Sequence, residues 1–198
     1  MKWLRTNYCG DLREEDIDSV VVLMGWCQTR RDHGGVIFVD LRDYTGITQI
    51  VFKVEISKDS HILADTIRGD FVLAVKGKVA SRIEGNLNLK LPTGKIEVLV
   101  EELEILNNSE TPPYVLENRE NVDEKLRLSY RFLDLRDVTL QNNLILRSKS
   151  MQIVRNYFTN NGFFEIETPF LTKSTPEGAR DYLVPSRANP GLFYALPQ

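Results

Sequence analysis

Hydrophobic and polar residues alternate over short stretches in the first hundred positions of the chain. The clearest stretch is 36–41, in which every odd-numbered position is aliphatic and the even-numbered positions include Phe38 and Asp40. Successive side chains of a β-strand point to opposite faces, so this pattern predicts a strand that is buried on one face. Less regular apolar runs predict four further strands, at 20–28, 47–52, 71–80 and 95–106.

A single helix is predicted between the third and fourth strands. Its apolar residues Ile62, Leu63 and Ile67 recur at helical spacing within 57–68, and Ser57 is placed to cap its N-terminus. A short hairpin loop is predicted at 43–46. Three strands, a helix and two strands follow the order of an OB-fold, a small Greek-key barrel that commonly binds oligonucleotides.

The second half of the chain has a different pattern, with a connector and a long helix in place of successive strands. A connector with two adjacent prolines is predicted at 107–121, and a charge-rich segment follows at 123–136. The strongest helical pattern covers 140–161, and Gly162 is placed to end that helix. A strand is predicted at 163–168. The apolar stripe of the helix consists of Leu144, Ile145, Ile153, Val154, Tyr157 and Phe158.

Composition and charge narrow the function classes. Hydrophobic residues make up 42% of the 198 residues, which is enough for a packed core. Positions 1–106 carry 14 basic and 17 acidic residues and 107–198 carry 11 of each, so neither half has the basic excess of a non-specific nucleic-acid binder. Any RNA recognition must therefore come from a local groove. No apolar run approaches the roughly 20 residues that span a bilayer.

The two cysteines, Cys9 and Cys27, do not have the spacing of a metal site or a redox pair. We therefore expect them to be small buried hydrophobic residues in a protein of the reducing cytoplasm, and we expect no metal site. The N-terminus also lacks the apolar stretch of a signal peptide.

The predicted strands place candidate RNA-binding groups together. Phe38 lies on the face opposite the aliphatic set of its strand, and Gln49 has the opposite parity to Ile50 and Phe52 on the next strand. An exposed aromatic ring beside an amide can stack an unpaired base and read its edge, and such stacking contributes about 1–3 kcal/mol per base. Arg30 and Arg31 could contact phosphate or a base edge.

Several motifs are more specific than these patterns. They lie at 8–10, 25–26, 30–42, 130–136, 165–169, 172–187 and 193–198, and together they span nearly the whole chain. In their wording, order and spacing they resemble the N-terminal portion of bacterial-type aspartyl-tRNA synthetases, a family of class II aminoacyl-tRNA synthetases.

The resemblance implies a mainly β and α+β architecture in three parts. An OB-fold that binds the anticodon would occupy 1–106, a hinge would occupy 107–136, and the start of a class II catalytic domain, with its motif 1, would occupy 137–198. In the family, motif 1 builds a homodimer interface. Ordinary core packing would explain the apolar stripe of the helix at 140–161 equally well.

The resemblance also implies contacts for individual residues. The implied anticodon-binding residues are Arg31, Phe38, Gln49, Arg82, Asn86 and Glu97. Taken singly, Phe38 could belong to the core, and the arginines could be solvated surface residues. Thr29 stands where many members have a further arginine. His33 and Gly85 resemble variants in members that charge both tRNA-Asp and tRNA-Asn, and relaxed anticodon specificity is therefore our hypothesis.

Catalysis in the family joins aspartate to tRNA with ATP and Mg²⁺. The resemblance implies that Glu177 binds the α-ammonium group of aspartate and that Gln198 lies at the edge of the same pocket. The family's motifs 2 and 3, which hold ATP, lie beyond the position of Gln198, so we expect neither bound cofactor nor aminoacylation from this chain alone. The alternatives are a free-standing tRNA-binding module and an asparaginyl- or lysyl-tRNA synthetase.

Overall fold

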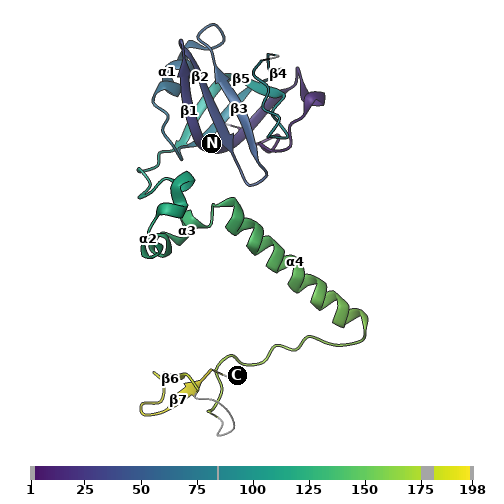
Figure 1. Ribbon diagram of the computed structural model, residues 1–198, viewed down its shortest axis with the longest axis vertical. Coiled ribbons are helices and arrows are strands. Elements are labelled where there is room, and N and C mark those ends of the chain that lie inside the picture. The colour runs from purple at the N-terminus through teal and green to yellow at the C-terminus, as the bar shows by residue number, and fades with distance from the viewer. Residues whose placement is uncertain (1–2, 84, 175–180, 197–198) are drawn as a thin grey trace. The chain divides into compact units, whose positions relative to one another are not determined.

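The computed structural model describes residues 3–83, 85–174 and 181–196 (Figure 1). The chain divides into two compact units, at 1–115 and 116–198. Among the described residues, the first unit is a β-barrel with one α-helix, and the second contains three α-helices and a two-stranded sheet. No described helix is long and apolar enough to cross a membrane.

The first unit is a closed five-stranded barrel. Its elements are β1 (Val20–His33), β2 (Val36–Arg42), β3 (Ile47–Phe52), α1 (Lys58–Asp65), β4 (Val72–Ser81) and β5 (Ile96–Asn107). The strands follow the order β1-β2-β3-β5-β4, with β3 and β5 parallel and the other described pairs antiparallel. Strand count, helix position and closure confirm the predicted OB-fold architecture.

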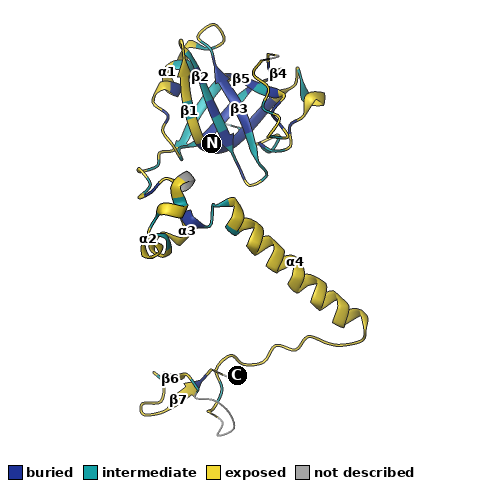
Figure 2. Cartoon of the chain, viewed as in Figure 1, coloured by how far each residue is buried: buried dark blue, intermediate teal, exposed yellow. Residues whose placement is uncertain are grey.

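The barrel encloses the main hydrophobic core (Figure 2). Ile37, Val39 and Leu41 are fully buried, which confirms the face predicted from the alternation in β2. The sheet also needs a close approach at Gly25, where an added Cβ would lie 2.4 Å from the carbonyl oxygen of Arg42. A glycine in β1 therefore lets the barrel close tightly against the end of β2.

A buried carboxylate joins the N-terminal segment to the β2–β3 hairpin. Asp43 Oδ2 accepts a hydrogen bond from the backbone N–H of Cys9 at 2.7 Å, and Asp43 Oδ1 accepts from the backbone N–H and the hydroxyl of Thr45 at 2.8 and 2.7 Å. Burial by itself would raise the pKa of Asp43, but these hydrogen bonds outweigh it and hold the pKa below its usual value. Asp43 therefore remains ionised inside the fold.

Both cysteines are buried free thiols, as predicted. Burial raises the pKa of the Cys27 thiol to about 12 and also raises that of Cys9, with nearby carboxylates adding to both shifts. Neither thiol is therefore ionised near neutral pH, and both act as apolar packing groups.

Helix α1 begins where the sequence predicts it. The Ser57 hydroxyl accepts a hydrogen bond from the backbone N–H of Ser60 at 3.3 Å, which confirms Ser57 as the N-cap. Strand β1 is longer than predicted and continues five residues beyond Gln28. Those residues are polar, and their pairing with β2 holds them in the strand without burial of an apolar face.

The second unit begins with short helical segments. They are η2 (Leu116–Asn121), α2 (Glu124–Ser129) and α3 (Arg131–Asp134). Asp134 is 1% exposed and accepts hydrogen bonds from Arg119 Nε at 2.6 Å and from Arg131 Nη1 at 2.5 Å. The contact with Arg119 anchors α3 to η2, and the contact with Arg131 lies within α3 itself.

Helix α4 (Val138–Asn160) confirms the predicted long helix. Gly162 has φ +85°, its N–H bonds to the carbonyl of Thr159, and the N–H of Phe163 bonds to the carbonyl of Phe158. This double hydrogen-bond pattern is the Schellman motif, so the predicted C-terminal cap is confirmed. No residue of α4 is buried, and its apolar stripe is exposed in the described chain.

The strand predicted at 163–168 is wrong. The structure forms no β-ladder there, and the first strand after α4 is β6 (Leu183–Pro185), which pairs with β7 (Phe193–Ala195). A strand requires a neighbour that takes up its backbone hydrogen bonds, and the described residues provide none for 163–168.

Candidate nucleic-acid interface

The outer face of β1, β2 and β3 holds a pocket of about 290 Å³ beside the loop between β4 and β5. Its lining is polar apart from one aromatic ring. The lining residues are Arg31, His33, Phe38, Asp40, Gln49, Arg82, Asn86 and Asn88. Five of the six residues expected at an anticodon site therefore line one pocket. The sixth, Glu97, does not line it but accepts a hydrogen bond from the lining residue Gln49.

Strand register explains this grouping. Arg31 of β1 is paired with Phe38 of β2, and Asp40 of β2 is paired with Gln49 of β3. Residues paired across antiparallel strands project from the same face. The alternation that buries Ile37, Val39 and Leu41 therefore turns Phe38 and Asp40 outward into the pocket.

Phe38 does not belong to the buried core. Its ring is half-buried, lines the pocket, and makes an edge contact with the exposed His33 ring, with 5.9 Å between the ring centroids and an interplanar angle of 63°. An aromatic ring anchored in a strand and open on one side can stack a nucleobase.

Gln49 and Glu97 form a polar pair at the pocket wall. Gln49 is only 8% exposed, and its Nε2 donates to Glu97 Oε2 at 3.0 Å. Glu97 lies on β5 opposite Ala80 of β4, so the pair links β3 to β5. The remaining carboxylate oxygen of Glu97 and the remaining amide oxygen of Gln49 can accept hydrogen bonds from the edge of a base.

Arg82 is a buried cation rather than a solvated surface residue. It is 7% exposed, and its Nε donates to the carbonyl oxygen of Ile96 at 2.8 Å. Burial lowers the pKa of Arg82 below its usual value, and the nearby carboxylates of Glu97 and Asp40 offset only part of this effect. An arginine remains protonated in this setting, so its terminal nitrogens supply fixed positive donors.

Arg31 is held by a carboxylate from the neighbouring strand. Its Nη2 donates to both oxygens of Asp40 at 3.0 Å, and the Thr29 hydroxyl donates to Asp40 Oδ2 at 2.5 Å. Thr29 therefore donates a hydrogen bond to the same carboxylate that holds Arg31. Many members of the resembled family carry another arginine at the position of Thr29. The side chain of Arg31 is 48% exposed and open to a ligand.

The β4–β5 loop supplies the rim of the pocket. Asn86 is exposed, and its backbone N–H donates to the carbonyl of Ile83 at 2.8 Å. The neighbouring Gly85 is exposed and does not line the pocket, and a Cβ added there would meet nothing within 4 Å. A larger side chain at position 85 would therefore fit without changing the fold.

Sequence reasoning missed two lining residues. Asp40 has the same strand parity as Phe38, and this signal could have identified it. Asn88 has no such signal, because only the folded loop brings it to the pocket, where its backbone N–H bonds to the carbonyl of Gly94 at 3.0 Å.

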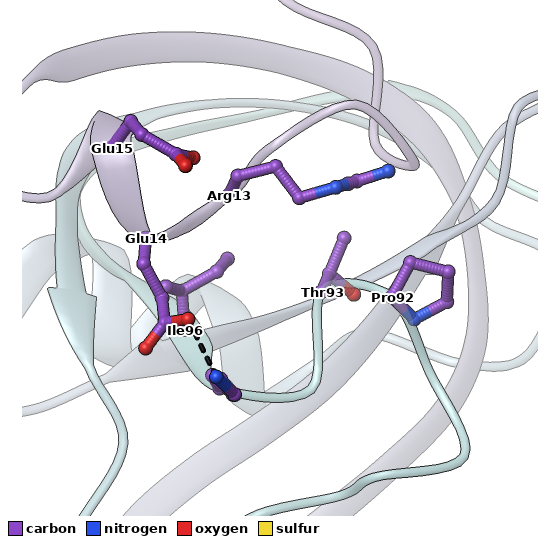
Figure 3. Close-up of a pocket in the computed structure, with 7 residues that line it drawn as sticks. Arg13, Glu14, Glu15, Pro92, Thr93 and Ile96 are labelled. Carbon is purple, nitrogen blue, oxygen red and sulfur yellow. Dashed lines mark hydrogen bonds and ion pairs between the residues drawn. The ribbon is translucent and has the colours of Figure 1, made fainter.

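A second, smaller pocket lies beside η1 (Glu14–Asp16) and is shown in Figure 3. Its volume is about 80 Å³, and it is lined by Arg13, Glu14, Glu15, Pro92, Thr93, Lys95 and Ile96. Lys95 and Glu14 form an ion pair at 2.7 Å, and the Thr93 hydroxyl donates to the carbonyl of Ile47. With mixed charge and no aromatic ring, this pocket suits a base less well than the first.

The second unit contains an apolar groove of about 340 Å³ along α4 and the residues after it. Phe158 and Phe163 pack edge to face in its wall, with 5.4 Å between the ring centroids, and Arg155 pairs with Glu165 at 3.0 Å. The groove continues the exposed apolar stripe of α4.

The residues expected to bind aspartate, Glu177 and Gln198, lie outside the described residues. Within 3–83, 85–174 and 181–196, no group of three or more histidine, cysteine, aspartate or glutamate side chains could hold a metal ion.

Comparison with known proteins adds independent information. Residues 21–106 match the model of the OB-fold nucleic acid binding domain, and residues 123–198 match the model of class II tRNA synthetases for D, K and N. The aspartate–tRNA(Asp/Asn) ligases of Thermoanaerobacter pseudethanolicus and Desulfotalea psychrophila are 56% and 58% identical to the chain over 194 residues, which is 98% of it. The chain spans about a third of the length of these relatives, 33% and 32% respectively.

A solved structure shows the same fold. The asparaginyl-tRNA synthetase of Pyrococcus horikoshii, in complex with asparaginyl-adenylate, superposes with a TM-score of 0.83 at 25% identity, over 99% of this chain and 43% of that chain. With both family models matched in order and close relatives over nearly the full chain, this chain belongs to the class II aminoacyl-tRNA synthetases and corresponds to an N-terminal portion of an aspartyl-tRNA synthetase.

Proposed function

We propose that the pocket on β1, β2 and β3 binds the anticodon loop of a transfer RNA. The observation that carries the proposal is the convergence of a half-exposed ring, Phe38, with the Gln49–Glu97 pair and two arginines on one face of an OB-fold. Single-stranded RNA is recognised by stacking of splayed bases and by hydrogen bonds to their edges, and this pocket offers both.

The longer protein would be an aspartate–tRNA ligase. This activity is named for the relatives that are 56% and 58% identical to the chain. In it, 1–106 would bind the anticodon, 107–136 would act as a hinge, and 137–198 would begin the catalytic domain. ATP, Mg²⁺ and aspartate belong to the proposed reaction of the whole protein in the cytoplasm. Glu177 and Gln198 remain the proposed aspartate-binding residues.

Both tRNA-Asp and tRNA-Asn are proposed substrates. By the genetic code their anticodons, GUC and GUU, differ only in the third base. Of the proposed determinants, His33 lines the pocket and contacts Phe38, and Gly85 directly precedes the lining residue Asn86. The relatives named above carry both tRNAs in their names, which supports the proposal.

The apolar groove along α4 supports a homodimer of the longer protein through motif 1. The stripe residues of α4 are between 48% and 67% exposed in the described chain. Such a contiguous apolar surface is typical of an interface. In the whole protein either a second subunit or the rest of the catalytic domain would cover it.

The anticodon proposal is tested by titrating the full 198-residue chain into a labelled anticodon stem-loop of tRNA-Asp. A hairpin with the same stem and a scrambled loop is the control, and the titration is repeated at about 50 and about 200 mM salt. We expect the native loop to bind at least about tenfold more tightly at both salt concentrations, because base-edge contacts contribute about 1–3 kcal/mol each. Equal affinity for the two hairpins would refute the proposal.

A further inference from the structure

Asp40 places a negative charge inside the pocket proposed to bind RNA, which is itself a polyanion. A carboxylate in such a pocket opposes the approach of phosphate, so its presence requires a compensating role. Its side chain is 22% exposed and stands on β2 directly across from Thr29 of β1 and Gln49 of β3. Asp40 therefore lies between β1, which carries Arg31 and His33, and β3, which carries Gln49.

The contacts of Asp40 converge on Arg31. Both carboxylate oxygens accept from Arg31 Nη2 at 3.0 Å, and the Thr29 hydroxyl donates to Oδ2 at 2.5 Å. The two hydrogen bonds that Arg31 makes within the described chain use a single nitrogen, so its Nε and Nη1 remain available to a ligand. The arrangement fixes the guanidinium group without consuming its binding capacity.

We propose that Asp40 is a positioning and specificity-determining residue, which holds Arg31 in its binding orientation and offsets the positive charge of the pocket. The inference rests on the proposed anticodon function. A free arginine loses much rotamer freedom when it is fixed on a ligand, and a side chain that is already fixed loses less. Asp40 thus strengthens the binding of the correctly placed loop.

The same charge should weaken the binding of incorrect RNA. An RNA that contacts the pocket only through phosphates feels the repulsion of Asp40 and gains nothing from the orientation of Arg31. Removal of the carboxylate should therefore weaken the binding of the cognate hairpin and leave the scrambled hairpin unchanged or bound more tightly. A purely structural role would change both affinities in the same direction.

The test is a double-mutant cycle in the full chain with Arg31→Ala, Asp40→Ala and the double variant. The probes are the anticodon stem-loop of tRNA-Asp and the hairpin with a scrambled loop. We expect Asp40→Ala to weaken binding of the anticodon stem-loop about three- to tenfold, and to leave the scrambled hairpin unchanged or bound more tightly. The loss of affinity for the anticodon stem-loop caused by Arg31→Ala should be much smaller in the Asp40→Ala background than in the parent chain.

Two further variants keep the test sharp. Glu102→Ala is the matched control, because Glu102 pairs with Lys76 on β4, neither residue lines the pocket, and its loss should leave both affinities unchanged. Asp40→Asn keeps the side-chain volume and one acceptor oxygen, so its loss should be smaller than that of Asp40→Ala. A thermal melt of each variant establishes that the barrel is folded.

The inference is overturned if Asp40→Ala binds the anticodon stem-loop as the parent does, or if the effects of Arg31→Ala and Asp40→Ala simply multiply. It is also overturned if both hairpins weaken equally. If the parent chain prefers the anticodon stem-loop and Asp40→Ala has the same affinities as the parent, only this inference is refuted. A parent chain without that preference would refute the anticodon proposal, and the inference with it.

Discussion

Replacement of Phe38 by alanine should weaken anticodon binding more than any other single truncation of an aromatic residue in the barrel. Phe38 is the one aromatic side chain among the residues that line the main pocket, apart from the imidazole of His33 that it contacts. The ring is not part of the buried core cluster, so its removal leaves the interior of the barrel intact. The effect should therefore appear in affinity rather than in stability.

The size of the effect follows from the proposed contact. Stacking of one base on an aromatic ring contributes about 1–3 kcal/mol, which corresponds to about a 5- to 150-fold change in the dissociation constant. The edge contact with His33 is lost as well, so the rim loses part of its support. We expect a loss of at least about tenfold for Phe38→Ala, with little change in the salt dependence because no phosphate contact is removed.

The assay is fluorescence anisotropy with the anticodon stem-loop of tRNA-Asp, at matched salt for every variant. Phe38→Tyr keeps the ring and should bind within about threefold of the parent, because stacking depends on the π-face that both rings share. Tyr44→Ala is a second control, since Tyr44 is a 79% exposed aromatic of the same barrel that does not line the pocket. If Phe38→Ala binds as tightly as Tyr44→Ala, Phe38 does not stack a base.

Four further predictions concern the pocket and the barrel that supports it. Gln49→Ala should weaken the anticodon stem-loop about fivefold or more, because it removes the partner of Glu97, and a titration measures this. Asp43→Ala should lower the free energy of unfolding by about 1–3 kcal/mol in a urea melt, since the buried N–H of Cys9 loses its acceptor. The folded pKa of Asp43 is depressed, so its stabilising contribution is complete above the unfolded pKa of about 3.9 and is lost as pH falls through the lower folded value. Melts from pH 5 to about pH 2 should therefore show a steeper loss in the parent than in Asp43→Asn; parallel curves would contradict this assignment. Gly10→Ala should also destabilise the barrel, because an added Cβ would lie 2.3 Å from the carbonyl oxygen of Thr45.

The barrel was largely predictable because its signals are local. Alternation in β2 fixed which face is buried, and the capping serine fixed the start of α1. The extent of β1 was not predictable from burial, because its last residues are polar and remain in the strand only through pairing with β2. Pairing is a long-range property that a single strand's sequence does not contain.

Most of the residues that line the pocket were also predictable, and only Asp40 and Asn88 were missed. Strand parity placed Phe38 and Gln49 on the outer face, and the resemblance to a known family supplied Arg82, Asn86 and Glu97. The contacts among these residues were not predictable, since they depend on the register of three strands and on a folded loop. The carboxylate of Asp40, which reads in sequence as an ordinary polar position, is a clear example.

The two units differ in how completely they pair their strands and bury their apolar side chains. The barrel closes its sheet and buries a continuous core, so its strands have partners and its apolar faces are covered. In the described part of 116–198, by contrast, α4 buries no residue, and Phe164, Ile166 and Phe170 are each at least 75% exposed. The failed strand at 163–168 has the same cause, because an extended apolar segment becomes a strand only beside another strand. In the longer protein proposed above, either further residues or a second subunit would cover this surface.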